Sequence, residues 1–177
     1  MTSAAGRAGE PAPVLRRLAP ADAEAFAAFR RAYLEDAPLA FGASPESDFL
    51  GSADSVRRQI ELGDASVIFG VFAPGLVAAV GLYRERRPKT AHKAHVWGMY
   101  VTPAHRGRGY GRRLLEAAVA HARTLAGVTV VHLSVTEAAP GARRLYESAG
   151  FEVWGSEPEG MRHGDRALLE HHMIRRL

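Results

Sequence analysis

The chain has 177 residues and a formal net charge of +4, which is the size of one domain with a charge that favours anionic partners. It contains no cysteine, which excludes a disulfide framework, a thiolate zinc site and a cysteine nucleophile, and we expect no metal. No apolar run approaches the length of a membrane span, so we expect a cytoplasmic protein without a membrane partner.

The N-terminal stretch MTSAAGRAGEPAP is small and polar, and it holds two prolines. It lacks the apolar centre that a signal peptide requires. We therefore predict a disordered tail over residues 1–12. One folded domain is expected over residues 13–177, because no linker or internal repeat interrupts this part of the sequence.

The first third of the domain is predicted to form one strand and two helices. A short strand is expected over Val14–Leu18, and Pro20 suits the first turn of a helix that Pro38 ends. The loop APLAFGASPESDF follows over residues 37–49. Ser52 is a suitable N-cap for the second helix.

The remainder alternates between apolar strand signals and two amphipathic helices. Six strands are predicted, over Ser66–Phe72, Leu76–Tyr83, His92–Val101, Val128–Val135, Phe151–Glu157 and Ala167–Leu177. The two helices are predicted over Gly109–Leu125 and Pro140–Ala149. This order predicts an α/β (α+β) fold, with a mixed, mostly antiparallel sheet of about six or seven strands and about four helices on both faces.

A glycine-rich loop connects a strand to a helix in the stretch MYVTPAHRGRGYGRRLLEAAV, residues 99–119. The first N–H groups of a helix have no partner within the helix and favour phosphate. Glycine keeps Cβ atoms away from such an anion and permits positive φ. The loop offers three glycines, Gly107, Gly109 and Gly111, and three cations, Arg106, Arg108 and Arg112.

The spacing of this loop matches neither common nucleotide motif. The GxxxxGK[ST] pattern and the GxGxxG pattern are both absent. The pattern present is Arg-x-x-Gly-x-Gly preceded by MYVTP, and LSVTEAAPGARRLYESAGF adds Leu145-Tyr146 and Gly150-Phe151 further on. These motifs, in this order, resemble those of small bacterial members of the GCN5-related N-acetyltransferase (GNAT) superfamily, over nearly the whole chain.

The resemblance implies a sheet that is splayed in the middle, with acetyl-CoA in the gap as cosubstrate. It implies transfer of acetyl by direct attack of a primary amine, on a small molecule or on a peptide or protein N-terminus. The implied coenzyme-binding residues are Met99, Tyr100 and Val101, chiefly through their backbone, and the loop residues Arg106, Gly107, Arg108, Gly109, Tyr110, Gly111 and Arg112.

The resemblance places Tyr146 near the coenzyme sulfur as proton donor to the leaving thiolate. The base that takes the amine proton stays open, because the strand HKAHVWGMYV lacks the carboxylate that many members use. His95 is one candidate, on the strand face expected to carry Trp97 and Met99. Glu137 is a second candidate, and a water relay is a third.

One position departs from the family pattern. Ala139 stands where members often have asparagine at the start of the Leu-Tyr helix, and Thr136 is a candidate to replace the lost hydrogen bond. For the acceptor we consider the loop over residues 37–49, with Glu46 and Asp48, the basic turn RERRPKTAHK, and the hairpin Met161–Asp165. The acidic and basic signals conflict, so the acceptor stays open.

Two other function classes are considered. A coenzyme-binding sensor without turnover is the alternative, supported by Ala139 and by the missing carboxylate. A nucleic-acid binder is suggested by charge alone, and it ranks last because the basic residues are not interleaved with stacking aromatics. A homodimer is an open expectation, since family members often form one.

Overall fold

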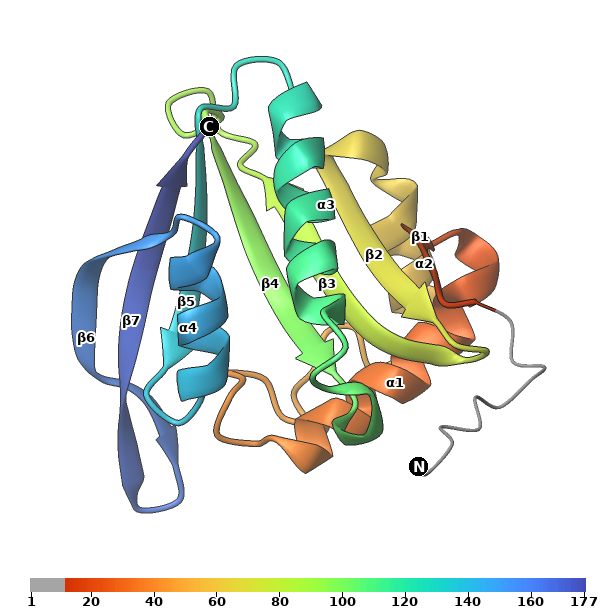
Figure 1. The fold of residues 1–177 in the computed structure, drawn as a ribbon, viewed down its shortest axis with the longest axis horizontal. Coiled ribbons are helices and arrows are strands. Elements are labelled where there is room, and N and C mark those ends of the chain that lie inside the picture. Colours follow the sequence, from red (N-terminus) through yellow and green to blue (C-terminus); the bar gives the residue numbers. More distant parts are fainter. Residues whose placement is uncertain (1–11) are drawn as a thin grey trace, which may run out of the picture.

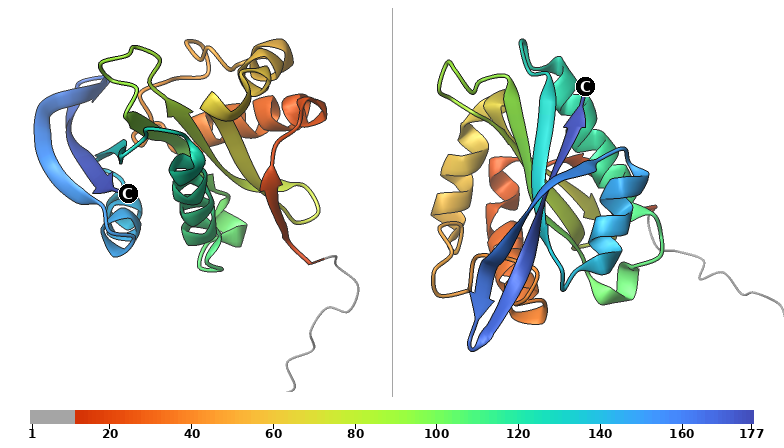
Figure 2. Two further views of the ribbon diagram at one scale, coloured as in Figure 1. Left: turned by 90° about the horizontal axis from the view of Figure 1, so that it is seen from above. Right: turned by 90° about the vertical axis from the view of Figure 1, so that its left-hand side faces the viewer.

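A seven-stranded sheet runs through the centre of the protein in the computed structural model, which describes residues 12–177 (Figure 1). Its strand order is β1-β2-β3-β4-β5-β7-β6. Helices α1 and α2 lie on one face, and α3 and α4 lie on the other (Figure 2). The predicted fold class is confirmed. The predicted tail lies outside the described residues, except for Ala12.

The elements follow the predicted order. The strands are β1 (Val14–Arg17), β2 (Ser66–Phe72), β3 (Leu76–Arg84), β4 (Lys93–Val101), β5 (Val130–Thr136), β6 (Glu152–His163) and β7 (Arg166–Arg176). The helices are α1 (Ala23–Asp36), α2 (Ala53–Glu61), α3 (Tyr110–Thr124) and α4 (Pro140–Ser148). The helix expected from Pro20 begins as a separate 3₁₀ turn, Pro20–Asp22, and β6 extends beyond the predicted Glu157.

Each face of the sheet has its own apolar core. On the α3 side, the predicted helix stripe is buried against the strands, through Leu114, Leu115, Ala118, Val119 and Ala122. On the α1 side, the core is rich in aromatic residues and includes Phe26, Phe29, Tyr33 and Tyr100. The start of α2 is fixed as expected, because the Ser55 N–H donates to Ser52 Oγ at 3.2 Å.

The sheet opens between β4 and β5, its one parallel pair among the described strands. These strands pair over three residues, Lys93–His95 with Val130–His132, and their further residues are not paired with each other. Strand β5 stays paired with β7 along its whole length. One edge of β4 and one edge of β5 are therefore free of strand partners toward their C-terminal ends.

A β-bulge interrupts β4 at Gly98. The pairing moves from Gly81–Trp97 to Ala79–Tyr100, so β4 contains one residue more than β3 between these pairs. Gly98 has a φ of +61°, which a residue with a side chain rarely adopts. The expectation that His95, Trp97 and Met99 share a face is wrong, because simple alternation fails at the bulge. Trp97 packs in the α1-side core and Met99 in the α3-side core.

Candidate active site

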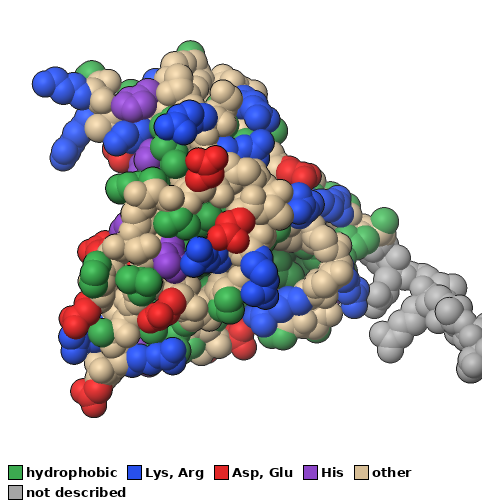
Figure 3. All heavy atoms as spheres, turned by 60° about the vertical axis from the view of Figure 1, so that its left-hand side comes forward, with side chains coloured by type: hydrophobic (Ala, Val, Ile, Leu, Met, Phe, Trp, Pro, Cys, Tyr) green, Lys and Arg blue, Asp and Glu red, His purple; other side chains and the backbone are tan. Residues whose placement is uncertain are grey.

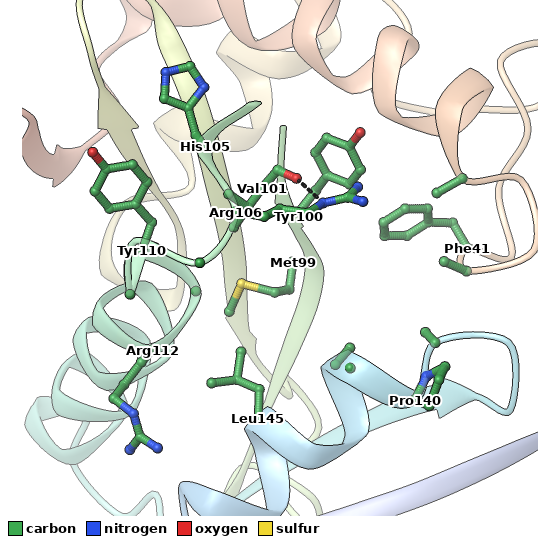
Figure 4. A pocket seen from close by; sticks show the side chains of 18 of the residues that line it. Phe41, Met99, Tyr100, Val101, His105, Arg106, Tyr110, Arg112, Pro140 and Leu145 are labelled. Carbon is green, nitrogen blue, oxygen red and sulfur yellow. Dashed lines mark hydrogen bonds between the residues drawn. The ribbon is translucent and has the colours of Figure 1, made fainter. Parts of the chain in front are cut away.

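A cavity of about 700 Å³ lies beside the free end of β4. Its lining comes from four places in the sequence: the segment after α1, the end of β4, the glycine loop with the start of α3, and the start of α4 (Figure 4). The lining residues are Ala37, Ala40, Phe41, Met99, Tyr100, Val101, His105, Arg106, Gly107, Gly109, Tyr110, Gly111, Arg112, Ala138, Ala139, Pro140, Gly141, Ala142 and Leu145.

The N-terminus of α3 opens into this cavity without a side-chain cap. The first N–H with a carbonyl partner at this end is that of Arg113, which donates to the Gly109 carbonyl at 3.1 Å. The N–H groups of the three preceding residues, 110–112, have no partner within the helix. Gly107 and Gly109 have φ of +74° and +78°, and a Cβ at either would meet open space. Backbone conformation thus requires these two glycines.

Gly111 is required for a different reason. A Cβ there would lie 3.1 Å from Leu145 Cδ2 on α4, so its absence lets α4 approach the start of α3. Leu145 itself lines the cavity. The Leu-Tyr motif and the glycine loop, which the sequence offered separately, are in direct contact in the fold.

The three arginines of the loop have different positions. Arg106 Nε donates to the Val101 carbonyl at 3.0 Å, which fixes the guanidinium at the end of β4 (Figure 4). Arg112 lines the cavity and donates from Nη2 to Ser148 Oγ at 2.8 Å. Arg108 is exposed and does not line the cavity, so the structure brings together two of the three predicted cations.

An aromatic wall closes the side of the cavity next to α1. The Tyr100 ring stacks on Tyr33 with centroids 5.0 Å apart, and Phe41 packs 4.6 Å from Tyr33. The Tyr100 hydroxyl donates to Asp36, which also lies 3.4 Å from Arg106 Nη2. Burial, and then the bond to Asp36, raises the pKa of Tyr100 to about 12, so Tyr100 remains a donor.

Tyr146 lies directly after the cavity-lining Leu145 but does not itself line the cavity. It is 6% exposed, and its ring meets Phe151 edge-on at 6.2 Å. Its hydroxyl has no hydrogen-bond partner among the described residues. Burial raises the pKa of Tyr146, which keeps the phenol protonated.

The candidate bases lie outside the cavity lining. His95 stands at the paired end of β4, with Nε2 3.2 Å from Glu85 Oε1 but not aligned for a hydrogen bond. Burial lowers the pKa of His95, and Glu85 offsets this in part. Glu137 Oε1 accepts the N–H of Leu169 at 3.1 Å. Glu137 is therefore hydrogen-bonded, and His95 has its nearest carboxylate, away from the cavity.

Thr136 and Ala139 lie close together at the end of β5 but differ in their surroundings. Ala139 lines the cavity, so the one position that departs from the expected motif faces this space. Thr136 is buried, and its hydroxyl donates to the Leu39 carbonyl at 2.7 Å. Thr136 thus ties the segment after α1 to β5, while its oxygen retains the capacity to accept a bond.

The segments that the sequence suggests for the acceptor site lie in different parts of the fold. Asp48 is buried and forms a bidentate pair with Arg30, at 2.6 and 2.7 Å, so its charge is already matched. Glu46 is exposed. The basic turn lies at the far end of β4 from the cavity. On the face shown in Figure 3, charges of both signs are interspersed.

Sequence reasoning missed two features of the site. Asp36, at the end of α1, reaches the cavity wall through Tyr100 and Arg106, which lie more than sixty residues away in the sequence. The run of small residues over 138–142 forms one wall of the cavity, a role that the sequence analysis does not assign to it. The sequence does contain a signal for this second feature, because consecutive small residues leave space beside the backbone.

The fold, the cavity and the uncapped helix end together define a class of protein. Residues 26–151, more than half of the chain, match the model of the acetyltransferase (GNAT) family, and the chain belongs to that family. Members of this family are N-acetyltransferases that take the acetyl group from acetyl-CoA. No helix over residues 12–177 is long and apolar enough to cross a membrane.

Individual relatives agree with this class. Over 59 residues, 33% of this chain, the sequence is 48% identical to mycothiol acetyltransferase from Thermobispora bispora, and the match spans 20% of that protein. A GNAT-family acetyltransferase from Streptococcus pneumoniae has a TM-score of 0.82 at 20% identity, covering 93% of this chain and 99% of its own. The putative acetyltransferase yncA from Salmonella typhimurium, solved with its cofactor acetyl-CoA, has a TM-score of 0.79 at 22% identity, covering 94% of each chain.

Proposed function

We propose that this chain transfers acetyl from acetyl-CoA to a primary amine, on a small molecule or at a peptide or protein N-terminus. The observation that carries the proposal is the uncapped N-terminus of α3 opening into a cavity beside the free edge of β4. An anionic group fits the helix end, and an extended chain with a carbonyl fits an unpaired strand edge. A cytoplasmic location and a homodimer stay predictions.

The residues present fit acetyl-CoA. The N–H groups of residues 110–112, which have no partner within the helix, would hold the pyrophosphate. Arg112 would add a full positive charge. The edge of Met99–Val101 that faces β5, which has no strand partner, would bond the pantetheine arm and supply an N–H to the developing oxyanion. Thr136 is retained as a candidate acceptor near Ala139, and Arg108 as a peripheral contact.

Tyr146 is proposed as the proton donor to the leaving thiolate. Its hydroxyl has no described protein partner, and its raised pKa keeps the proton in place until a base forms nearby. We therefore expect Tyr146→Phe to lower kcat by about tenfold or more while changing the affinity for acetyl-CoA little. An unchanged kcat would remove Tyr146 from the mechanism.

Binding is tested first by thermal unfolding with and without acetyl-CoA, because a ligand of the native state stabilises it by about 2.7 kcal/mol at 100 times its Kd. Arg112→Ala should weaken the shift, and Arg123→Ala, exposed near the end of the same helix, should not. No shift with the wild-type protein would refute the coenzyme site.

Turnover is tested by thiol release with benzylamine, alaninamide, spermidine and an alanine-initiated tripeptide. Release with at least one amine supports the transferase. Binding of acetyl-CoA without release from any amine favours the sensor alternative, to which the absence of a carboxylate from the cavity lining gives some support.

A further inference from the structure

A chain of hydrogen bonds links three side chains on neighbouring strands β5, β7 and β6. Ser134 Oγ lies 3.0 Å from His172 Nδ1, and His172 Nε2 lies 2.9 Å from Glu157 Oε2. With Glu157 accepting from Nε2–H, the neutral imidazole has its free lone pair on Nδ1, facing the Ser134 hydroxyl. A hydroxyl, an imidazole and an orienting carboxylate in this order form a proton-transfer unit.

The unit stands on the face of the sheet opposite α3, and its three side chains lie outside the cavity lining. Leu133 and Val135 are buried in the α3-side core, so Ser134 between them points to the other face, where it is exposed. Ser134 is two residues beyond His132, the last β5 residue paired with β4. It thus lies along the free edge of β5 that leads to the cavity lining at Ala138.

A bulge in β6 places the Trp154 ring beside the His172 imidazole. The register of β6 on β7 shifts between Val153 and Gly155, and the Trp154 ring lies 5.5 Å from His172 and 6.4 Å from His132. The charged and titratable groups facing His172 are Glu157 on β6, Glu170 on β7 and His132 on β5. Side-chain ligand atoms of Glu157, Glu170 and His172 lie within 4.8 Å of one another.

We propose that Ser134 and His172 take the proton that the acceptor amine must lose, with Glu157 as the positioning residue that holds the imidazole. This proposal rests on the proposed acetyl transfer. The ammonium gives a proton to Ser134 Oγ while Ser134 gives its own to His172 Nδ1. The nitrogen lone pair then forms the C–N bond, the C–S bond breaks with its electrons on sulfur, Tyr146 protonates the thiolate, and the second nitrogen proton replaces the one that Tyr146 gave.

The test uses the panel amine with the highest wild-type turnover. His172→Ala should lower kcat/KM for this amine about 100-fold, with the KM for acetyl-CoA within about twofold. Added imidazole should restore much of the lost rate, which a structural role does not predict. Ser134→Ala should be slow and Ser134→Thr, which keeps the hydroxyl, close to wild type.

The pH profile gives a second readout. A neutral His172 accepts the proton, so wild-type kcat/KM should fall as the pH is lowered, and Glu157→Gln, which removes a negative charge beside the imidazole, should move this acid limb to lower pH. The matched control is Glu152→Gln, exposed on β6 and outside the elements considered for the acceptor. Each variant is checked by its melting temperature and by its thermal shift with acetyl-CoA.

The outcomes separate the two proposals. A wild-type protein that binds acetyl-CoA but acetylates no amine refutes the transfer, and the relay with it. A wild type that turns over, with His172→Ala equally fast or not rescued by imidazole, overturns the relay alone. A wild-type rate that EDTA abolishes would also overturn the relay, because the proposed steps need no metal.

Discussion

The two ends of β4 differ in what surrounds the same strand. At its N-terminal end, His95 stacks between Tyr83, at 4.8 Å, and His132, at 5.4 Å, and the strand is paired on both edges. At its C-terminal end, Met99–Val101 line the cavity, and the edge toward β5 is free. Residues of the same strand therefore pack against neighbouring strands at the closed N-terminal end and face the cavity at the open C-terminal end.

The junction between the two ends is held from the α1 side. Arg30 lies 5.4 Å from the Trp97 ring, and a Cβ on Gly98 would come within 3.4 Å of Arg30 Nη1. The Arg30–Asp48 pair therefore supports the bulge that separates the closed end from the open one. Substitutions at this junction should therefore have the largest effect on the stability of the arrangement that distinguishes the two ends of β4.

The largest effect is expected for Asp48→Asn. The variant leaves the Arg30 guanidinium buried without its charge partner, so the free energy of unfolding should fall by about 3–5 kcal/mol. Urea unfolding at pH 7 measures this. Asp54→Asn, whose carboxylate is 78% exposed beside Arg57, is the control and should cost about 1 kcal/mol or less. Equal losses would show that the junction depends on no buried charge.

Gly98→Ala should come next. Its φ of +61° strains a side chain, and the added Cβ would lie 3.0 Å from the Tyr33 hydroxyl, so we expect a loss of about 1–3 kcal/mol. Gly42→Ala, which meets nothing within 4 Å, should change stability by less than about 0.5 kcal/mol. A neutral Gly98→Ala would mean that the bulge tolerates an ordinary residue.

Thr136→Val tests the attachment across the open end. Losing the bond to the Leu39 carbonyl should cost about 1 kcal/mol of unfolding free energy. It should also raise the KM for acetyl-CoA, because Ala40 and Phe41 next to Leu39 line the cavity. The exposed Thr129→Val is the control for both measurements. A stability loss without any change in the KM for acetyl-CoA would show that the segment after α1 does not contribute to coenzyme binding.

The smallest effect is a pH dependence at the closed end. Burial lowers the pKa of His95 in the folded state, so below an unfolded value of about 6.5 the unfolded chain binds more protons. Stability should therefore decrease as pH falls from 7.5 toward the folded pKa. His95→Gln should flatten this slope, whereas the exposed His92→Gln should not. If the slope persists in His95→Gln, another group causes the pH dependence. His132 is one such group, because burial lowers its pKa as well.

Sequence predicted those parts of the site that depend on local order. The glycine loop, the start of α3 and the Leu145-Tyr146 helix are each written in consecutive residues, and all were placed correctly along the chain. The bulge at Gly98 was not predicted, because alternation is the default for a strand and the shift depends on packing against Tyr33 and Arg30.

Contacts between distant segments escaped prediction for a related reason. His172 meets Glu157 because the β6 bulge at Trp154 sets the register of β6 on β7. Asp48 looked like an available acidic loop residue, because nothing near it in sequence reveals that Arg30 neutralises it. Pattern reasoning identifies elements and local motifs, whereas register and ion pairing are decided when the elements pack.

The three-residue pairing of β4 with β5 has a consequence for hydrogen exchange. Amides of residues 133–136 that point toward β4 have no strand partner there, whereas those that point toward β7 are bonded. In the free protein, alternate amides of one buried strand should exchange at very different rates. A bound extended ligand that filled the gap would slow the fast set selectively, so β5 itself would report occupancy, residue by residue, without any chemical reaction.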